Sequence, residues 1–504
     1  MLQEPWKHLK SGTDIRGVAL EGVEGQHVDL TDEVVAKIAS AFALWLQTKT
    51  GKKELTVAIG RDSRLSGSHI MAILDDVLVK AGFSVLTVLG MASTPAMFMT
   101  TLDLDCDAAI QITASHHPWN RNGLKFFLPT GGLEGKDIGE ILELCQEGKG
   151  APAVAGGSTR TIAYMDTYAD RLKKLIREGV GGGEKPLEGF HVAVDAGNGA
   201  GGFYVNRVLV PLGANCDGSQ FLEPDGSFPN HIPNPENKVA MEFACRAVKE
   251  SGADLGIIFD TDVDRAGCVD STGREINRNR LVALASVIAL QGNEGGAIVT
   301  DSITSAGLKT FIEGHLGGQH LRFKRGYKNV INKAIEMNNA GINTPLAIET
   351  SGHAALRENY FLDDGAYLAT RILIEAAKMK KEGRDLTELI SALDEPAESV
   401  ELRFNITEAD FRPVGEAVLA RLEAYGKEQG WAVADDSYEG VRIAFGQGEG
   451  EGWFLLRLSV HDPVMPLNIE SDIAGGTKVI AAKLLSVLEG EAALDLSPLQ
   501  EFVK

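Results

Sequence analysis

The sequence predicts an α/β protein in which three successive blocks of strands and helices precede a smaller α+β domain. Its 504 residues are enough for roughly three or four domains. Up to about residue 395, short apolar runs alternate with helical patterns, and most of the runs end in a polar or glycine-rich loop. After Pro396 several strands follow one another between helices, which is typical of an α+β domain. We therefore expect four domains, covering 1–160, 161–279, 280–395 and 396–504.

The composition restricts the partners of the chain. A formal net charge of −21 argues against nucleic acid or an anionic membrane as a general partner, so an anionic substrate would need a locally basic cleft. The five cysteines are scattered without a CxxC pair, which favours reduced thiols and a cytoplasmic location. The first ten residues lack an apolar signal core, and no apolar run approaches the length of a membrane span.

The first block contains a helix over 31–47 and a buried strand over 55–59, which ends in Gly60-Arg61-Asp62-Ser63-Arg64. Ligands of open α/β sheets bind at the carboxyl ends of strands, and arginine suits a phosphate or a carboxylate there. Arg61 is therefore a candidate anion contact, with a surface ion pair as the equally open alternative. Residues 11–17 and 93–95 are expected to form turns, and 151–161 a linker.

The loop that follows the strand at 108–112 carries the main catalytic candidate. It presents Ser115 beside His116 and His117, in a polar turn held by Pro118 and Gly123, with Lys125 ten residues after the serine. A serine hydroxyl becomes a good nucleophile only when a base or a metal activates it. Taken alone, such a pair is more often a polar turn with a capping serine, but the motifs further along the chain favour chemistry.

The second block ends its apolar strand, 253–259, at three alternating aspartates, Asp260, Asp262 and Asp264. In an extended chain these side chains would point to the same side, and three carboxylates repel one another unless a cation neutralises them. Ligation by oxygen alone suits Mg²⁺. A solvated acidic strand end is the alternative. The glycine-rich loop 196–202 is more simply a crossover turn than a phosphate cradle, because the Walker pattern is absent.

The third block has strands at 297–300, 320–323 and 346–348. The loop after the last of these offers the carboxylate of Glu349, the hydroxyl of Ser351 and the imidazole of His353, a set that suits sugar hydroxyls. The C-terminal block is expected to contain strands at 400–404, 431–433, 441–445 and 453–458, with helices at 409–428 and 476–488. Arg457 and Ser459 alternate on one strand face, a plausible contact for an anion.

Three of these motifs, in this order, resemble those of the α-D-phosphohexomutase family, the phosphoglucomutases and phosphomannomutases. Residues 113–118 resemble the phosphoserine loop, 260–265 the metal loop and 349–353 the sugar loop. The resemblance covers nearly the whole chain and implies four domains around a central cleft. It also implies a phosphate transfer between C1 and C6 of glucose or mannose, through a phosphoserine enzyme and a hexose 1,6-bisphosphate.

The resemblance assigns roles to individual residues. Ser115 would carry the phosphate and, with Asp260, Asp262 and Asp264, would hold Mg²⁺. The charge in transfer would be stabilised by Arg265 and Arg61, with Lys125 or His116 as general acid or base. The residues implied in substrate binding are Glu349, Ser351 and His353 for the sugar, and Lys328, Arg457 and Ser459 for the phosphate that is not transferred.

The sequence departs from the family pattern at two places. His117 stands where the family usually has asparagine, and the usual Arg-Pro-Ser-Gly-Thr-Glu-Pro loop reads Arg-Leu-Ser-Val-His-Asp-Pro at 457–463. A loop without that glycine cannot wrap a phosphate in the same way. A metal-dependent sugar phosphatase and a non-catalytic sugar-phosphate sensor are therefore kept as alternatives, and the sequence decides neither the preferred hexose nor the oligomeric state.

Overall fold

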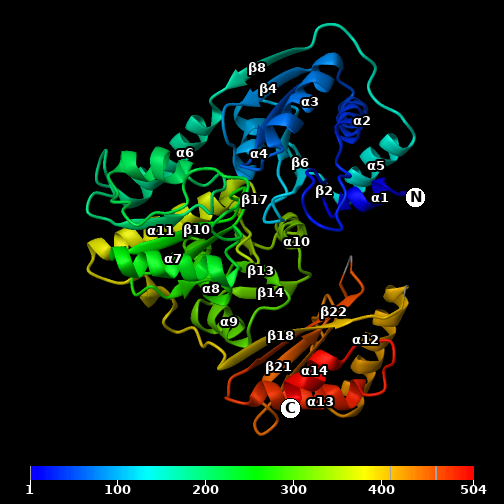
Figure 1. The fold of residues 1–504 in the computed structure, drawn as a ribbon. Helices are drawn as coiled ribbons and strands as arrows, with labels where there is room; N and C mark the ends of the chain where they lie inside the picture. The colour runs from blue at the N-terminus through cyan, green and yellow to red at the C-terminus, as the bar shows by residue number, and fades with distance from the viewer. Residues whose placement is uncertain (1, 409, 460–461) are drawn as a thin grey trace. The chain divides into compact units, whose positions relative to one another are not determined.

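The computed structural model describes residues 2–408, 410–459 and 462–504, and the chain divides into two compact units. The first unit holds Met1–Asn277, Ser351–Ala354 and Leu362–Glu388; the second holds Arg278–Thr350, Ala355–Phe361 and Leu389–Lys504 (Figure 1). In the described part of the chain, no helix combines the length and apolar character that a membrane span requires.

The first unit begins with an eight-stranded mixed sheet in the order β1-β2-β6-β5-β3-β4-β8, with β7 paired to β6. Its strands are β1 (Lys10–Ser11), β2 (Asp14–Val18), β3 (Thr56–Arg61), β4 (Ser84–Val88), β5 (Ala108–Ile112), β6 (Arg121–Leu128), β7 (Gly131–Gly132) and β8 (Ser158–Ile162). Strands β5, β3, β4 and β8 run parallel, whereas β6 is antiparallel to both β5 and β2. Its helices are α1 (Trp6–Leu9), α2 (Asp32–Thr50), α3 (Gly67–Lys80), α4 (Thr94–Asp103) and α5 (Gly135–Gln146).

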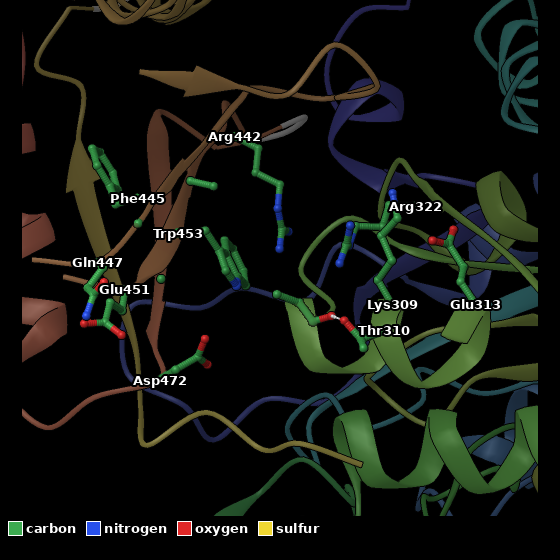
Figure 2. A pocket seen from close by; sticks show the side chains of 14 residues that line it. Lys309, Thr310, Glu313, Arg322, Arg442, Phe445, Gln447, Glu451, Trp453 and Asp472 are labelled. Atoms are coloured by element: carbon green, nitrogen blue, oxygen red, sulfur yellow. Dashed lines mark hydrogen bonds between the residues drawn. The ribbon is translucent and has the colours of Figure 1, made fainter. Parts of the chain in front are cut away.

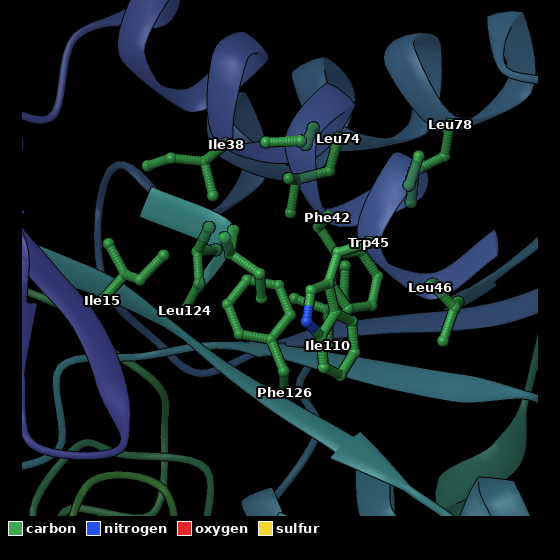
Figure 3. Packing of buried hydrophobic residues seen from close by; sticks show 14 of the residues in the cluster. Ile15, Ile38, Phe42, Trp45, Leu46, Leu74, Leu78, Ile110, Leu124 and Phe126 are labelled. Carbon is green, nitrogen blue, oxygen red and sulfur yellow. The ribbon is translucent and has the colours of Figure 1, made fainter. Parts of the chain in front are cut away.

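Helix α2 supplies much of the core of this sheet. It begins where the Thr31 hydroxyl accepts from Val34 N, and it ends at Gly51, whose φ of 68° suits a residue without a Cβ. Its buried face packs Phe42 against Phe126 of β6, with ring centroids 4.6 Å apart (Figure 3). This packing fixes β6, the strand that also carries Lys125.

The rest of the first unit is a four-stranded sheet, in the order β12-β11-β10-β9, with its helices. The strands are β9 (Val192–Asp195), β10 (Leu255–Phe259), β11 (Ala266–Asp270) and β12 (Glu275–Ile276), and the α-helices are α6 (Tyr164–Val180), α7 (Lys238–Ser251) and α11 (Gly365–Lys381). The first turn of α11 is held because Tyr168 of α6 donates its hydroxyl to Asp364 at 2.7 Å. Strands β10 and β11 form an antiparallel hairpin whose connecting turn is residues 260–265.

The second unit opens with three parallel strands, β13 (Ala297–Asp301), β14 (Gln319–Phe323) and β15 (Leu346–Ile348). The helices of this part are α8 (Arg278–Leu290), α9 (Ala306–Thr310) and α10 (Tyr327–Asn339). The sheet continues through β16 (Ala354–Leu356) to β17 (Leu362–Asp363), whose residues belong to the first unit. The C-terminal part is an antiparallel sheet in the order β18-β22-β21-β20-β19. Its strands are β18 (Glu398–Asn405), β19 (Ala432–Val433), β20 (Val441–Phe445), β21 (Gly452–Leu456) and β22 (Val464–Ser471), and its helices are α12 (Phe411–Glu428), α13 (Gly476–Leu488) and α14 (Ser497–Val503).

The α/β class with mixed sheets agrees with the prediction, but several local predictions were wrong. Residues 93–95 begin helix α4, because the Ser93 hydroxyl caps it by accepting from Ala96 N. The expected turn at 11–17 is confined to Gly12 and Thr13, with β1 and β2 on either side, and the end of the expected linker forms β8, which extends the sheet beside β4. Strand β22 was missed altogether. Ala409, expected to begin a helix, and Val460 and His461 of the 457–463 loop lie outside the described residues.

Candidate active site

Three buried aspartates gather on the turn between β10 and β11. Oxygens from Asp260, Asp262 and Asp264 all lie within 4.8 Å of one another. The sequence had suggested that an extended chain points these carboxylates to the same side, but that is not how they come together. Residues 260–265 instead form a turn in which Val263 has a left-handed φ of 66°, and this turn folds the carboxylates inward.

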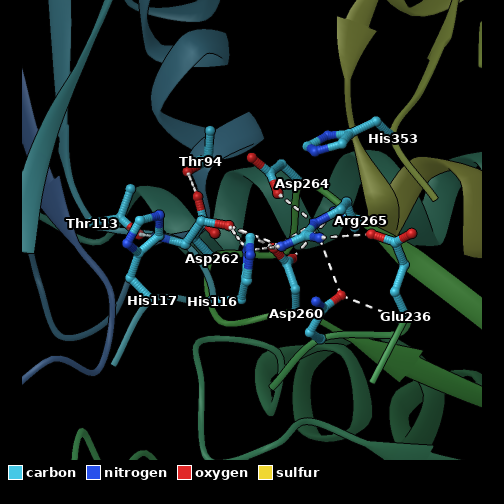
Figure 4. A network of polar contacts seen from close by, with 12 residues as sticks. Thr94, Thr113, His116, His117, Glu236, Asp260, Asp262, Asp264, Arg265 and His353 are labelled. Atoms are coloured by element: carbon cyan, nitrogen blue, oxygen red, sulfur yellow. Dashed lines mark hydrogen bonds and ion pairs between the residues drawn. The ribbon is translucent and has the colours of Figure 1, made fainter. Parts of the chain in front are cut away.

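Two cations neutralise part of this acidic turn. Arg265 donates from Nε to Asp260 Oδ2 at 3.1 Å, and Lys125 donates from Nζ to Asp262 Oδ2 at 3.0 Å and to Asp264 Oδ2 at 2.5 Å (Figure 4 shows the aspartates and Arg265). The Oδ1 atoms of Asp262 and Asp264 are buried and lack a hydrogen-bond partner among the described residues. Buried carboxylate oxygens without donors are what a hard cation requires. The donor set therefore fits Mg²⁺.

Neighbouring charges separate the pKa values of these carboxyls. Burial and the charge of Asp264 raise the pKa of Asp260 well above its usual range. Burial opposes the ionisation of Asp264 as well, but Lys125 and His353 lower its pKa below the usual value. A bound divalent cation would compete with the proton that Asp260 favours.

Ser115 lies directly against this turn. Its hydroxyl accepts from Arg265 Nη2 at 3.0 Å, and Oγ is 3.3 Å from both Asp260 Oδ2 and His116 Nδ1. The serine is buried and has a φ of 50°, an uncommon backbone conformation that persists only where neighbouring contacts hold it. The serine, histidine, arginine and aspartates predicted from separate motifs are thus brought together.

His116 accepts a hydrogen bond beside the serine. Its Nδ1 is 2.6 Å from Arg265 Nη2, and because a guanidinium only donates, Nδ1 must be the acceptor (Figure 4). Burial and the charge of Arg265 lower the pKa of His116 to about 2, and burial and Arg16 lower that of His117 to about 3. Both rings are therefore neutral, and the lone pair of His116 Nδ1 accepts from Arg265, at 3.3 Å from Ser115 Oγ.

Arg64 holds the serine loop in place, a role that the sequence reading missed. Its guanidinium is buried and donates to the backbone oxygens of Pro118 and Arg121, each at 2.8 Å, and to those of Ser115 and His117. Four carbonyls on one planar cation fix the path of the loop. The motif Gly60-Arg61-Asp62-Ser63-Arg64 contains both arginines, and only Arg61 was named from the sequence as a candidate anion contact. In the structure Arg61 donates to Asp62 O and to Met91 Sδ.

A chain of hydrogen bonds reaches the serine backbone from the same strand end. Asp62 accepts from Thr113 Oγ1 at 2.6 Å, and that oxygen accepts from Ser115 N at 2.9 Å. Burial, opposed by Arg64, raises the pKa of Asp62 to about 6. On the other side, Thr94 donates to Asp262 Oδ2 at 2.5 Å (Figure 4). Thr94 was also missed, because residues 93–95 were read as a turn.

We expect Arg64→Lys to lower kcat by roughly 10- to 100-fold with little change in KM, since an ammonium cannot hold four carbonyls in a plane. Steady-state kinetics checks this, provided that the thermal midpoint of the variant matches that of the unaltered protein. Arg207→Lys, at an exposed arginine paired with Asp166, is the control and should behave as the unaltered protein. An unchanged kcat would remove the positioning role of Arg64.

The sugar-loop candidates belong to two different units. Glu349, in the second unit, accepts from Gly326 N at 2.7 Å. Ser351, in the first unit, has a buried hydroxyl without a partner among the described residues. His353 pairs with Asp363 and lies beside Asp264. Burial acts to lower the pKa of His353, but Asp363 and Asp264 raise it to about 9, so this imidazole is a cation beside the acidic turn.

The predicted phosphate contacts lie in the second unit. Backbone bonds from Arg457 N to Pro466 O (3.1 Å) and from Ser459 N to Val464 O (2.9 Å) continue the β21–β22 hairpin. The Nε of Arg457 is buried without a partner in the described part of the chain, and burial lowers the pKa of the guanidinium. An arginine with an unused buried donor suits an anion. Lys328 lies in the first turn of α10.

Known protein families match most of the chain. Models of the phosphoglucomutase/phosphomannomutase α/β/α domains I, II and III match residues 8–149, 166–273 and 277–395. A phosphomannomutase/phosphoglucomutase of Pseudomonas putida is 30% identical over 451 residues, 88% of this chain and 90% of that protein. A phosphoglucomutase of Neisseria gonorrhoeae is 29% identical over 477 residues, 94% of this chain and 96% of that one.

The fold also matches a solved structure. A phosphoglucomutase/phosphomannomutase family protein from Burkholderia thailandensis superposes with a TM-score of 0.79 at 26% identity, covering 98% of this chain and 99% of that one. The similarity therefore extends over the C-terminal part as well as the three α/β blocks.

Proposed function

We propose that this chain, which belongs to the phosphoglucomutase/phosphomannomutase family and is therefore a mutase of the isomerase class, moves a phosphate between C1 and C6 of a hexose by way of Ser115. The family suggested by the sequence motifs is thus confirmed. The observation that carries the residue-level proposal is the buried Ser115 hydroxyl, in contact with Arg265, His116 and Asp260. Phosphoryl transfer depends on alignment and charge neutralisation, and these neighbours supply both.

The proposed cycle begins with phosphate on Ser115. The free hydroxyl of a glucose or mannose phosphate bonds to this phosphorus as the bond to Ser115 Oγ breaks, and its proton ends on Ser115 Oγ, which leaves a hexose 1,6-bisphosphate. After the intermediate turns over, Ser115 Oγ bonds to its other phosphorus as the bond from that phosphorus to the sugar oxygen breaks, and the serine proton ends on the sugar oxygen. Arg265 stabilises the charge on the transferring group. Lys125 and His116 both stay candidates for carrying the proton, since Lys125 is tied to Asp262 and Asp264 and His116 Nδ1 accepts from Arg265.

We assign Asp260, Asp262 and Asp264, together with phosphorylated Ser115, to a Mg²⁺ ion. Bound there, the ion would supply positive charge against the phosphate oxygens. Lys125 and Arg265 would then share the same carboxylates and keep the site close to neutral. The Oδ1 atoms of Asp262 and Asp264, which are buried without a hydrogen-bond partner among the described residues, support this assignment.

The remaining candidates are assigned to the ends of the substrate. Glu349 and Ser351 would hold sugar hydroxyls, whereas Lys328, Arg457 and Ser459 would bind the phosphate that is not transferred. We keep the four domains 1–160, 161–279, 280–395 and 396–504 as part of this proposal. We further place the enzyme in the cytoplasm, because its five cysteines are free thiols.

We expect Arg457→Ala to raise KM for hexose phosphate by about 10- to 100-fold with kcat nearly unchanged, because its contact is similar in the ground and transition states. Arg403→Ala, in the exposed Arg403–Glu401 pair of the same sheet, is the control and should leave KM unchanged. An unaltered KM in the Arg457 variant would remove the distal-phosphate role alone.

A product assay tests the reaction itself. Incubation with glucose 1-phosphate or mannose 1-phosphate, trace bisphosphate and Mg²⁺ should yield the corresponding 6-phosphate without release of inorganic phosphate. Release of inorganic phosphate as the main product would indicate a phosphatase, and the absence of any turnover would indicate a sugar-phosphate sensor.

A further inference from the structure

The second unit contains a pocket of about 600 Å³ that none of the residues proposed for the reaction lines. Its walls come from α9, β14, β20 and β21 and the segments beside them. The charged and aromatic residues that line it are Lys309, Glu313, Arg322, Arg442, Phe445, Glu451, Trp453 and Asp472 (Figure 2). A pocket of this size is typical of a small-molecule site.

Two arginines of this pocket, the buried Arg442 and the half-buried Arg322, lack an ion pair among the described residues, although the charges of Asp436 and Glu470 act on both. Arg442 donates to Ser302 O at 2.9 Å and to Thr304 O at 3.1 Å, and its guanidinium stacks on Trp453 at 3.5 Å from the ring centroid. Arg322 donates from Nη2 to Ser305 O at 2.7 Å and from Nε to Thr304. Neither guanidinium forms an ion pair with any carboxylate that the structure describes. Backbone oxygens thus hold both cations in place but do not neutralise them.

The pKa values of both arginines are lowered in this arrangement. Burial and the charge of Arg322 lower the pKa of Arg442 well below its usual value, and burial lowers the pKa of Arg322 as well. The nearby Glu470 accepts from Trp453 Nε1 at 3.1 Å, and burial raises its pKa to about 7, so it offers only part of a negative charge. Buried charges are costly unless they are paired, so an anion in the pocket would relieve this cost.

Further groups define the rest of the ligand. Lys309 lies on the same side as Arg322 and has neither a hydrogen-bond nor an ion-pair partner within the described ranges, and Figure 2 shows both facing Arg442 and Trp453. Glu451 and Asp472 lie elsewhere on the lining, away from Lys309 and Glu313 (Figure 2). Glu313 lies beside the cations and accepts from His320 N, so three cations and one carboxylate share that part of the pocket, and Glu451 and Asp472 offer acceptors in another part.

We propose that this pocket is a second ligand site, which binds the phosphate or carboxylate group of a small molecule at Arg322, Arg442 and Lys309. Hydroxyl or ammonium groups of the same molecule would contact Glu451 and Asp472. Charge-assisted bonds to fixed guanidinium groups supply the affinity for the anion. Because different strands and a helix of the second unit provide the lining, the ligand would stabilise this unit in the arrangement observed.

Calorimetric titration of the full-length protein with inorganic phosphate, and separately with acetate, tests the site. We expect Arg322→Gln to weaken binding of the preferred anion by about 10- to 100-fold, because charged hydrogen bonds are lost. The Arg403→Gln variant is the control and should bind as the unaltered protein does. The proposal would be overturned if phosphate binding were fully retained in Arg322→Gln and lost only in Arg457→Ala. It would also be overturned if the unaltered protein bound neither anion at about 10 mM.

A second variant keeps the test decisive if Arg322→Gln fails to fold. Lys309→Ala removes an ammonium without a structural partner, so it should fold normally and still weaken anion binding. Its mutase turnover in the absence of added phosphate or acetate should match the unaltered protein, which separates this site from the reaction. Anion affinity unchanged by Lys309→Ala would contradict the proposal.

Discussion

Ser115→Ala should abolish mutase turnover, with a fall in kcat on the order of 10⁴-fold or more, because it removes the only atom proposed to carry the phosphate between half-reactions. The substitution keeps the packing of a buried residue. It removes the hydroxyl between Arg265 and His116, so the bisphosphate cannot return its phosphate to the enzyme. Measurement of hexose 6-phosphate formed from the 1-phosphate, with added bisphosphate, gives the size of the effect.

Ser63→Ala is the matched control for this variant. Ser63 is also buried in the first unit, and its hydroxyl lacks a hydrogen-bond partner among the described residues, so the substitution should leave turnover unchanged. Turnover by Ser115→Ala close to that of the control would show that Ser115 is not the carrier.

Asp262→Asn should lower kcat by on the order of 10²- to 10³-fold, because it removes one negative charge from the proposed Mg²⁺ ligands. The amide can still contact Thr94 or Lys125, so the fold should survive. A readout independent of activity is the rise in thermal midpoint when Mg²⁺ is added to the chelator-treated protein, which the variant should lose.

Asp217→Asn is the control for the metal prediction, since Asp217 is exposed. It should respond to Mg²⁺ as the unaltered protein does. An Asp262 variant with the same Mg²⁺-dependent midpoint as this control would contradict the assignment of Asp262 as a ligand.

The parts of the fold that follow the strand and helix periodicities were predictable. Strand β5, for example, was predicted within its observed bounds, because a run that is apolar except for Gln111 ends in a polar turn. Strand β22 was not found because Pro466 and Asn468 interrupt its pattern, although it is paired on both sides in the sheet. Pairing with β18 and β21 decides its conformation, and the local residue pattern does not predict such long-range contacts.

The site was predictable where one motif holds all the groups and less so where distant segments meet. The cluster of Asp260, Asp262 and Asp264 is a single turn, so the sequence revealed it even though the assumed extended geometry was wrong. The role of Arg64 depends on where its guanidinium lies relative to a loop about 50 residues further on, which spacing does not reveal. Its neighbour Arg61 has the same chemistry, and only packing separates the two.

The most direct test of the central claim is the intact mass of the purified protein, followed by peptide mapping of residues 108–125. We predict one added phosphate on Ser115, which disappears on incubation with a hexose 1-phosphate that the enzyme isomerises and returns with hexose 1,6-bisphosphate and Mg²⁺. A protein that turns over hexose phosphate but never carries phosphate on Ser115 would contradict the account.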